Sequence, residues 1–183
     1  MYSRSSEPVR FERDCAAVLV PQGDEVTLPA GTVGYITQSL GGSWTVFVGG
    51  NLMRIAGKDA DAIGKEPPTP IELPEGASDE DVEKLVWQQL RTCFDPEIPV
   101  NIVELGLVYS ADVRHREGGQ REVEVRMTLT APACGMGEIL VEDVRSKIEL
   151  IPTVAEADVE LVFDPPWNRT MMSELARLET GML

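Results

Sequence analysis

Short runs of β-branched and other apolar residues alternate with glycine-rich turns over the first 60 residues. This alternation is typical of β-strands. Gly41-Gly42 and Gly49-Gly50 stand where tight turns would join the last three runs. No amphipathic helix of about ten residues is indicated before Asp59. The sequence therefore predicts a small all-β module over residues 1–64, with strands at 16–20, 33–38, 44–48 and 52–55.

A proline-rich stretch, KEPPTPIELPEGA, follows at residues 65–77. Proline at this density fixes an extended, semi-rigid backbone and interrupts helices and central strands. We therefore expect a linker here.

After the linker the apolar residues recur at helical spacing. Ser78 followed by three acidic residues is typical of a helix start with a capping box. Val82, Leu85, Val86 and Leu90 then form one apolar stripe, which predicts a helix over 79–92. The same reasoning predicts strands at 105–114, 122–130 and 157–163 and helices at 137–149 and 168–179. The order α-β-β-α-β-α indicates a two-layer α+β domain over residues 78–183.

The net charge is −15, from 16 Lys and Arg against 31 Asp and Glu. A chain this acidic is not expected to bind nucleic acid, or an anionic membrane, through a general basic surface. No run of about 18 apolar residues is present, and the N-terminus lacks the apolar stretch of a secretory signal. Three widely spaced cysteines do not form a disulfide framework. These observations predict a cytoplasmic protein in a reducing compartment.

The same residue counts limit the metal chemistry. With three cysteines, one histidine and no CxxC pair, one chain cannot supply a four-cysteine cluster site. The histidine, His115, lies in a charged hairpin turn and is expected to be solvated.

The first unusual loop reads TCFDPEIPVN and places a thiol, Cys93, beside two carboxylates, Asp95 and Glu97. Pro96 and Pro99 stiffen this turn. Two interpretations remain open. Asp95 caps the turn that follows while Glu97 is solvated, or the two carboxylates ligate a hard metal or orient a proton.

The second loop, TLTAPACGMGE, contains Thr130, Cys134, Gly135 and Gly137 between a strand and the next helix. A cysteine near a helix N-terminus meets free backbone N–H groups, which favour thiolate. The glycines permit close approach of a backbone or ligand. The alternative is a small buried thiol; we favour a reactive or metal-binding one.

The third loop, Asp164-Pro165-Pro166-Trp167-Asn168-Arg169, is expected to form a stiff corner pinned by Trp167. Arg169 could instead face an anion or a partner.

Together these three motifs, and the N-terminal LPAGTVGYITQSLGGSWTV, resemble the SufT family of the larger PaaD-like, metal–sulfur cluster biosynthesis group. The resemblance implies an α+β cluster-assembly domain, a role in iron–sulfur protein maturation and a reactive cysteine at Cys134. It also aligns a DPE turn with Asp95-Pro96-Glu97. Gly135 stands where the wider group commonly has proline, so the environment of the thiol can differ.

We therefore hypothesise an auxiliary factor in iron–sulfur cluster assembly or delivery, not an enzyme, with Cys134, Asp95 and Glu97 as ligands of a transiently held cluster or iron. Its partners would be assembly proteins and apo-clients, and a homodimer could complete the ligand set. The alternative is a metal-free adaptor that recruits apo-clients. A cysteine-dependent enzyme is less favoured, because no histidine or basic residue accompanies Cys134 in its motif.

Overall fold

The computed structural model describes residues 6–95, 98–131 and 135–181. It divides into two units, Met1–Thr69 and Pro70–Leu183, each with its own hydrophobic core. The division falls inside the proline-rich stretch. Among the described residues, no helix combines the length and the apolar character needed to cross a bilayer.

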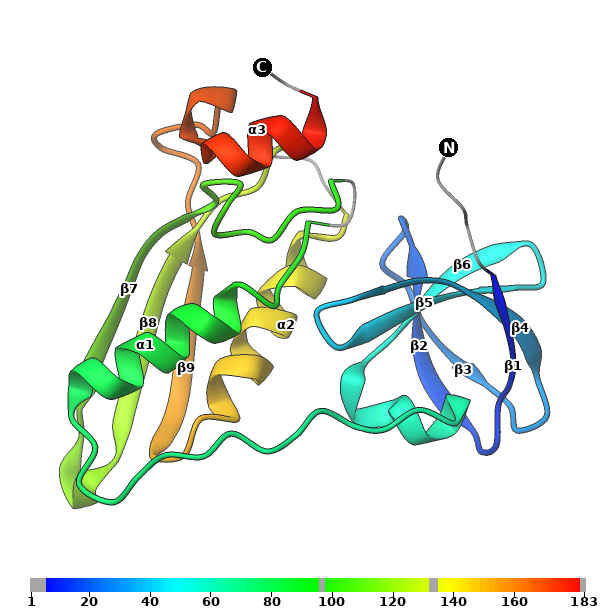
Figure 1. Ribbon diagram of the computed structural model, residues 1–183, viewed down its shortest axis with the longest axis horizontal. Helices are drawn as coiled ribbons and strands as arrows, with labels where there is room; N and C mark the ends of the chain where they lie inside the picture. Colours follow the sequence, from blue (N-terminus) through cyan, green and yellow to red (C-terminus); the bar gives the residue numbers. More distant parts are fainter. Residues whose placement is uncertain (1–5, 96–97, 132–134, 182–183) are drawn as a thin grey trace. The chain divides into compact units, whose positions relative to one another are not determined.

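Unit 1 is an antiparallel β-sheet in the strand order β1-β4-β5-β6-β2-β3, followed by a short 3₁₀ helix (Figure 1). Its inward-facing side chains include Phe11, Val46 and Ile55, which are fully buried. The elements are β1 (Glu7–Arg10), β2 (Cys15–Val20), β3 (Glu25–Leu28), β4 (Val33–Leu40), β5 (Ser43–Val48), β6 (Asn51–Ile55) and η1 (Gly57–Ile63).

The all-β prediction for this region is confirmed, with all four expected strands present. Two further strands, β1 and β3, were missed. Each has four residues and carries Glu or Arg among its apolar positions, so neither shows a run long enough to be recognised. They lie at the two ends of the sheet order.

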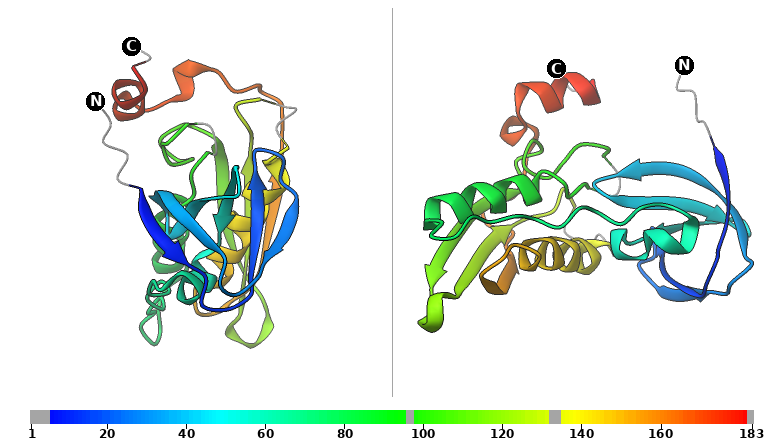
Figure 2. Two further views of the ribbon diagram at one scale, coloured as in Figure 1. Left: turned by 90° about the vertical axis from the view of Figure 1, so that its right-hand side faces the viewer. Right: turned by 60° about the horizontal axis from the view of Figure 1, so that its bottom comes forward.

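Unit 2 has a three-stranded sheet in the order β7-β8-β9, with β7 (Val108–His115) antiparallel to β8 (Arg121–Met127) and β8 parallel to β9 (Val154–Leu161). Helix α1 (Asp79–Leu90) contacts β7, and α2 (Gly137–Glu149) contacts β9 and α1 (Figures 1 and 2). Because a parallel pair needs a crossover, α2 supplies the connection from β8 to β9.

One face of this sheet is apolar and the other is charged. Val123, Val125 and Met127 of β8 are buried in the core, whereas Glu122 and Glu124 alternate with them and form ion pairs with neighbouring arginines. This alternation is expected of a sheet with helices on one face only. The predicted α+β fold class is therefore confirmed.

Five of the six elements predicted in unit 2 have other bounds in the structure. The strand expected at 122–130 spans Arg121–Met127, and the strand expected at 157–163 spans Val154–Leu161. Helix α1 ends at Leu90 rather than at residue 92, and the first strand begins at Val108 because residues 101–107 form turns. The expected final helix over 168–179 is two elements, η3 (Arg169–Met171) and α3 (Glu174–Thr180). The break occurs because Ser173 is extended and accepts a hydrogen bond from the Ala176 N–H, which starts a new helix.

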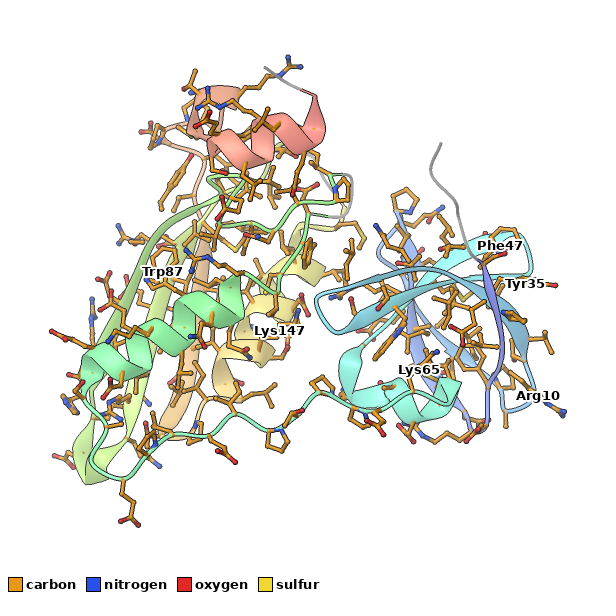
Figure 3. All side chains as sticks on the ribbon, viewed as in Figure 1. Arg10, Tyr35, Phe47, Lys65, Trp87 and Lys147 are labelled. Carbon is orange, nitrogen blue, oxygen red and sulfur yellow. The ribbon has the colours of Figure 1, made fainter. Side chains whose placement is uncertain are left out.

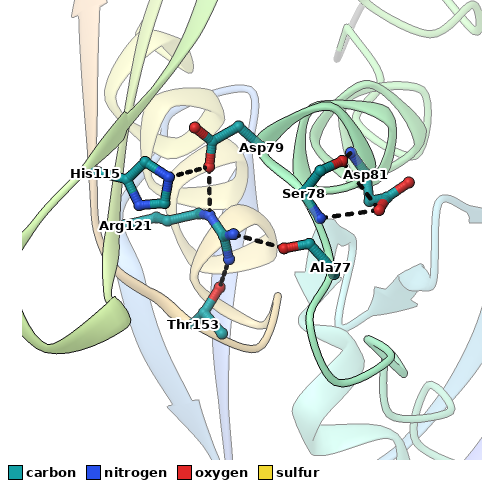
Figure 4. A network of polar contacts seen from close by, with 7 residues as sticks. All are labelled: Ala77, Ser78, Asp79, Asp81, His115, Arg121 and Thr153. Atoms are coloured by element: carbon teal, nitrogen blue, oxygen red, sulfur yellow. Dashed lines mark hydrogen bonds and ion pairs between the residues drawn. The ribbon is translucent and has the colours of Figure 1, made fainter.

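The N-terminal end of α1 is joined to the sheet by Arg121 (Figure 4). Its guanidinium donates to Asp79 Oδ1 at 2.8 Å, to Thr153 Oγ1 at 2.7 Å and to the Ala77 carbonyl at 2.8 Å. His115 ends β7, before the 3₁₀ turn η2 (Glu117–Gly119), and its side chain is 60% exposed, as predicted. The sequence did not indicate that His115 Nε2 lies 2.9 Å from Asp79 Oδ1.

Candidate functional site

The carboxylate of Asp95 is held at the exit of α1. The residue is 6% exposed, and its Oδ1 accepts a hydrogen bond from the Ile98 N–H at 3.0 Å. This contact agrees with the capping interpretation and fixes the direction of the carboxylate. Pro96 and Glu97 lie outside the described residues, so the pairing of Asp95 with Glu97 remains a prediction.

The chain immediately before Asp95 is anchored to the second helix of unit 2. Lys147 Nζ donates to the Thr92 carbonyl at 2.7 Å, and the Gln89 side chain donates to the Lys147 carbonyl at 2.9 Å. Figure 3 labels Lys147 on α2 beside the C-terminal end of α1. Cys93, next in sequence, is buried in the core, and its Sγ lies 3.6 Å from the Gln89 carbonyl oxygen. Its position indicates a packing role.

The turns at residues 101–107, here called the connecting segment, join two of the predicted motifs. On one side, Asn101 pairs with Phe94 in a β-bridge, and the Ile102 N–H donates to the Cys93 carbonyl at 2.9 Å. On the other side, the Thr128 N–H donates to the carbonyl at the end of the connecting segment at 2.8 Å. The Asp95 turn and the end of β8, which leads to the cysteine loop, are therefore both hydrogen-bonded to the connecting segment.

The third motif is also hydrogen-bonded to the connecting segment. Residues 163–173, here called the strap, follow β9 and include Trp167, whose Nε1–H donates to the Leu105 carbonyl at 2.7 Å. The Ser173 N–H donates to the Glu104 carbonyl at 2.8 Å. Trp167 also packs against the core of unit 2, so the predicted pinned corner is confirmed. Arg169 is exposed on η3, and its role stays open.

The cysteine loop is described only at its ends. Thr130 is half-buried after β8, Gly135 is exposed, and Gly137 is the buried first residue of α2. A Cβ on Gly137 would lie 2.8 Å from Leu129 Cδ1, so glycine permits the helix start to approach the strand end closely. Cys134 lies outside the described residues, three positions before the first residue of α2.

One hydroxyl near this loop is unusual. The Thr128 side chain is fully buried, and its Oγ1 has no hydrogen-bond partner within the described part of the chain. A buried hydroxyl normally has a partner, because leaving it unpaired costs free energy.

The remaining thiol belongs to unit 1. Cys15 is buried, and burial, followed by the charge of Asp59, raises the pKa of its thiol. It therefore stays protonated at neutral pH and is a poor metal ligand. Across residues 6–95, 98–131 and 135–181, no three His, Cys, Asp or Glu side chains are grouped so that they could hold a metal ion.

The chain is similar in sequence to known proteins. A Porphyromonas gingivalis protein named Fe-S protein maturation auxiliary factor is 48% identical over 101 residues, which are 55% of this chain and 92% of the relative. The family described as iron-sulfur cluster assembly protein matches residues 83–160, within unit 2. This chain belongs to that family.

Two further proteins are similar to this chain. The Staphylococcus aureus protein named Fe-S protein maturation auxiliary factor SufT is 36% identical and covers 49% of this chain and 97% of its own length. A Bacillus anthracis structure titled domain of unknown function DUF59 is 35% identical, covers 57% of this chain and 96% of its own, and has a TM-score of 0.49. The resemblance to SufT is confirmed; its extension to the N-terminal residues remains a prediction.

Proposed function

We propose that this protein is an auxiliary factor in iron–sulfur cluster assembly or delivery. One observation of the structure supports this proposal most directly. The Asp95 turn, the strand end leading to Cys134 and the strap are all hydrogen-bonded to the connecting segment. Three motifs that are far apart in sequence thus meet in unit 2. Two relatives are named Fe-S protein maturation auxiliary factors, and these names support a role in iron–sulfur protein maturation.

In this proposal iron or an iron–sulfur cluster is cargo. The Cys134 thiolate is the soft ligand, and Asp95 and Glu97 are harder auxiliary ligands. Gly135 leaves room beside the thiol, and Thr130 lies on the same loop. Because one chain offers too few thiols to ligate a cluster fully, the remaining ligands come from a client, an assembly protein or a second copy. Incomplete ligation suits a factor that must release what it binds.

The proposal is tested by anaerobic reconstitution of the full chain with ferrous iron and sulfide. We expect the wild-type protein to retain iron and to develop sulfide-to-iron charge-transfer absorption, whereas Cys134→Ala should lose both. Cys15→Ala is the matched control, because that thiol is buried in unit 1. Equal iron retention by wild type and Cys134→Ala would refute the assigned ligand.

The adaptor alternative is favoured by one feature of unit 1. Tyr35, Phe47 and Leu52 are all exposed, and they are paired across β4, β5 and β6. They line a groove of about 610 Å³, and Figure 3 labels Tyr35 and Phe47 on this unit. Exposed apolar surface of this kind marks many protein-interaction sites.

The carrier and adaptor functions predict different effects of two substitutions on the maturation of a client protein. A metal-free adaptor would still support maturation of an apo-ferredoxin by assembly proteins after Cys134→Ala, and would lose that activity after Phe47→Ser. A carrier would lose that activity after Cys134→Ala and keep it after Phe47→Ser.

A further inference from the structure

We infer that Trp167 is a positioning residue, which fixes the direction of the Asp95 carboxylate through the connecting segment. The inference rests on the proposed function, because it assigns Trp167 a part in holding the cargo rather than only in folding. It is carried by a continuous series of contacts between described residues.

The series begins at the indole. Trp167 Nε1–H donates to the Leu105 carbonyl at 2.7 Å, and the Leu105 N–H donates to the Asn101 carbonyl at 3.1 Å. Asn101 is bridged to Phe94, and Phe94 is bonded covalently to Asp95. The hydrogen bond of Trp167 to Leu105 is therefore linked to the residue before Asp95 by two backbone contacts, Leu105 with Asn101 and Asn101 with Phe94.

The turn between these contacts is itself well defined. The Asn101 side-chain oxygen accepts hydrogen bonds from the Val103 N–H at 3.1 Å and the Glu104 N–H at 3.0 Å. A displacement of Leu105 is consequently transmitted to Asn101 rather than absorbed by a loose loop. This stiffness is what a positioning role requires.

The strap lies directly on the connecting segment. Gly106 has φ +75°, and a Cβ at this position would collide with the Met171 carbonyl oxygen. Tyr109 OH donates to the Pro165 carbonyl at 2.7 Å, which anchors the beginning of the strap to β7. Trp167 and Tyr109 thus each contribute one hydrogen bond that fixes the strap to the rest of unit 2. Each bond can be removed separately by substitution.

The test uses the full chain and the variants Trp167→Phe and Tyr109→Phe, which keep a six-membered aromatic ring and remove one donor each. Trp87→Phe is the matched control, because Trp87 packs against the same core from α1. The first readout is amide hydrogen exchange at Ile98, whose N–H donates to Asp95. The second readout is the affinity for ferrous iron under anaerobic conditions, measured while each variant is fully folded.

We expect Trp167→Phe to accelerate exchange at Ile98 and to weaken iron binding about tenfold, as is common when a group supporting a metal ligand is removed. Tyr109→Phe should change both in the same direction, and Trp87→Phe neither. Unchanged exchange at Ile98 would overturn the inference, and so would faster exchange with unchanged iron affinity, since that result describes a structural strap only.

Failure of the proposed function is distinguishable from failure of this inference. If the wild-type chain binds no iron, the proposed function is refuted and with it the functional part of this inference. The exchange rate at Ile98 then still decides whether the strap controls the Asp95 turn.

Discussion

Replacing Arg121 by methionine should strongly destabilise unit 2, because this arginine is buried and donates three hydrogen bonds. The side chain is 7% exposed, and its three contacts join the residue before the α1 cap, the first turn of α1 and the turn before β9. Methionine fills similar space but donates no hydrogen bond. Asp79, Thr153 and Ala77 would each lose a charge-assisted partner.

The magnitude follows from what is left unpaired. Removing one partner from a buried ion pair costs about 3–5 kcal/mol. Asp79 is 41% exposed and keeps its contact with His115, so water and the imidazole offset part of the loss. We therefore expect about 3 kcal/mol. For a unit of this size that free energy lowers the Tm by roughly 10 °C.

The assay is urea and thermal unfolding of the full chain followed by far-UV circular dichroism, where the helices of unit 2 dominate the signal. Arg126→Met is the matched control. Arg126 lies on the same strand but is 55% exposed, with ion-pair distances of 3.4 and 3.6 Å, so we expect a change within about 0.5 kcal/mol. Equal destabilisation by the two substitutions would refute the argument.

A double-mutant cycle separates the Thr153 contact from the rest. Thr153 has φ 74°, an uncommon conformation for a β-branched residue, and both its carbonyl and its hydroxyl accept hydrogen bonds from Arg121. Thr153→Ala should cost about 1 kcal/mol in the wild-type background and almost nothing beside Arg121→Met. Additive effects would show that the hydroxyl contact contributes nothing.

Two further outcomes concern the capping box of α1. Ser78→Ala should cost about 1 kcal/mol, measured by urea unfolding, because the Ser78 hydroxyl accepts from the Asp81 N–H. The Ser78 backbone N–H, and then its hydroxyl, lower the pKa of Asp81 in the folded protein. The stabilisation is therefore present above the unfolded pKa of about 3.9 and is lost as the pH falls through the folded value. Asp81→Asn should flatten this acid limb of the stability–pH curve, and an unchanged limb would contradict the assignment.

Local sequence signals predicted the elements whose ends are determined locally. The bounds of α2 agree with the expected 137–149, because Gly137 and a regular apolar stripe mark them. Likewise Ser78 marks the start of α1 with a complete capping box. The strands β1 and β3 could not be found in this way, because each has four residues with few apolar ones. In addition, β1 pairs with β4, which is distant in sequence.

In the candidate site, too, local features were easier to predict than contacts between separate parts of the chain. A capping contact of Asp95 was one of the two interpretations that the proline-rich turn left open, and the hydrogen bond from the Ile98 N–H agrees with it. A turn after Asp95 was expected, but its end was placed too early, because LGLVY was assigned to the predicted strand although Gly106 is a turn signal. The connecting segment is hydrogen-bonded to Cys93, Thr128 and Trp167, and no sequence periodicity encodes contacts between such separate parts of the chain.

The charge of the chain is concentrated in the unit that contains the motifs. Unit 1 has 6 Lys and Arg against 8 Asp and Glu, a net charge of −2, and unit 2 has 10 against 23, a net charge of −13. A field of this sign attracts ferrous iron and repels an anionic thiolate-ligated cluster. It would thus favour loading of the cation and disfavour retention of the finished cluster. In the proposed function, long-range electrostatics and the shortage of thiols act in the same direction, toward a cargo that is held briefly and passed on.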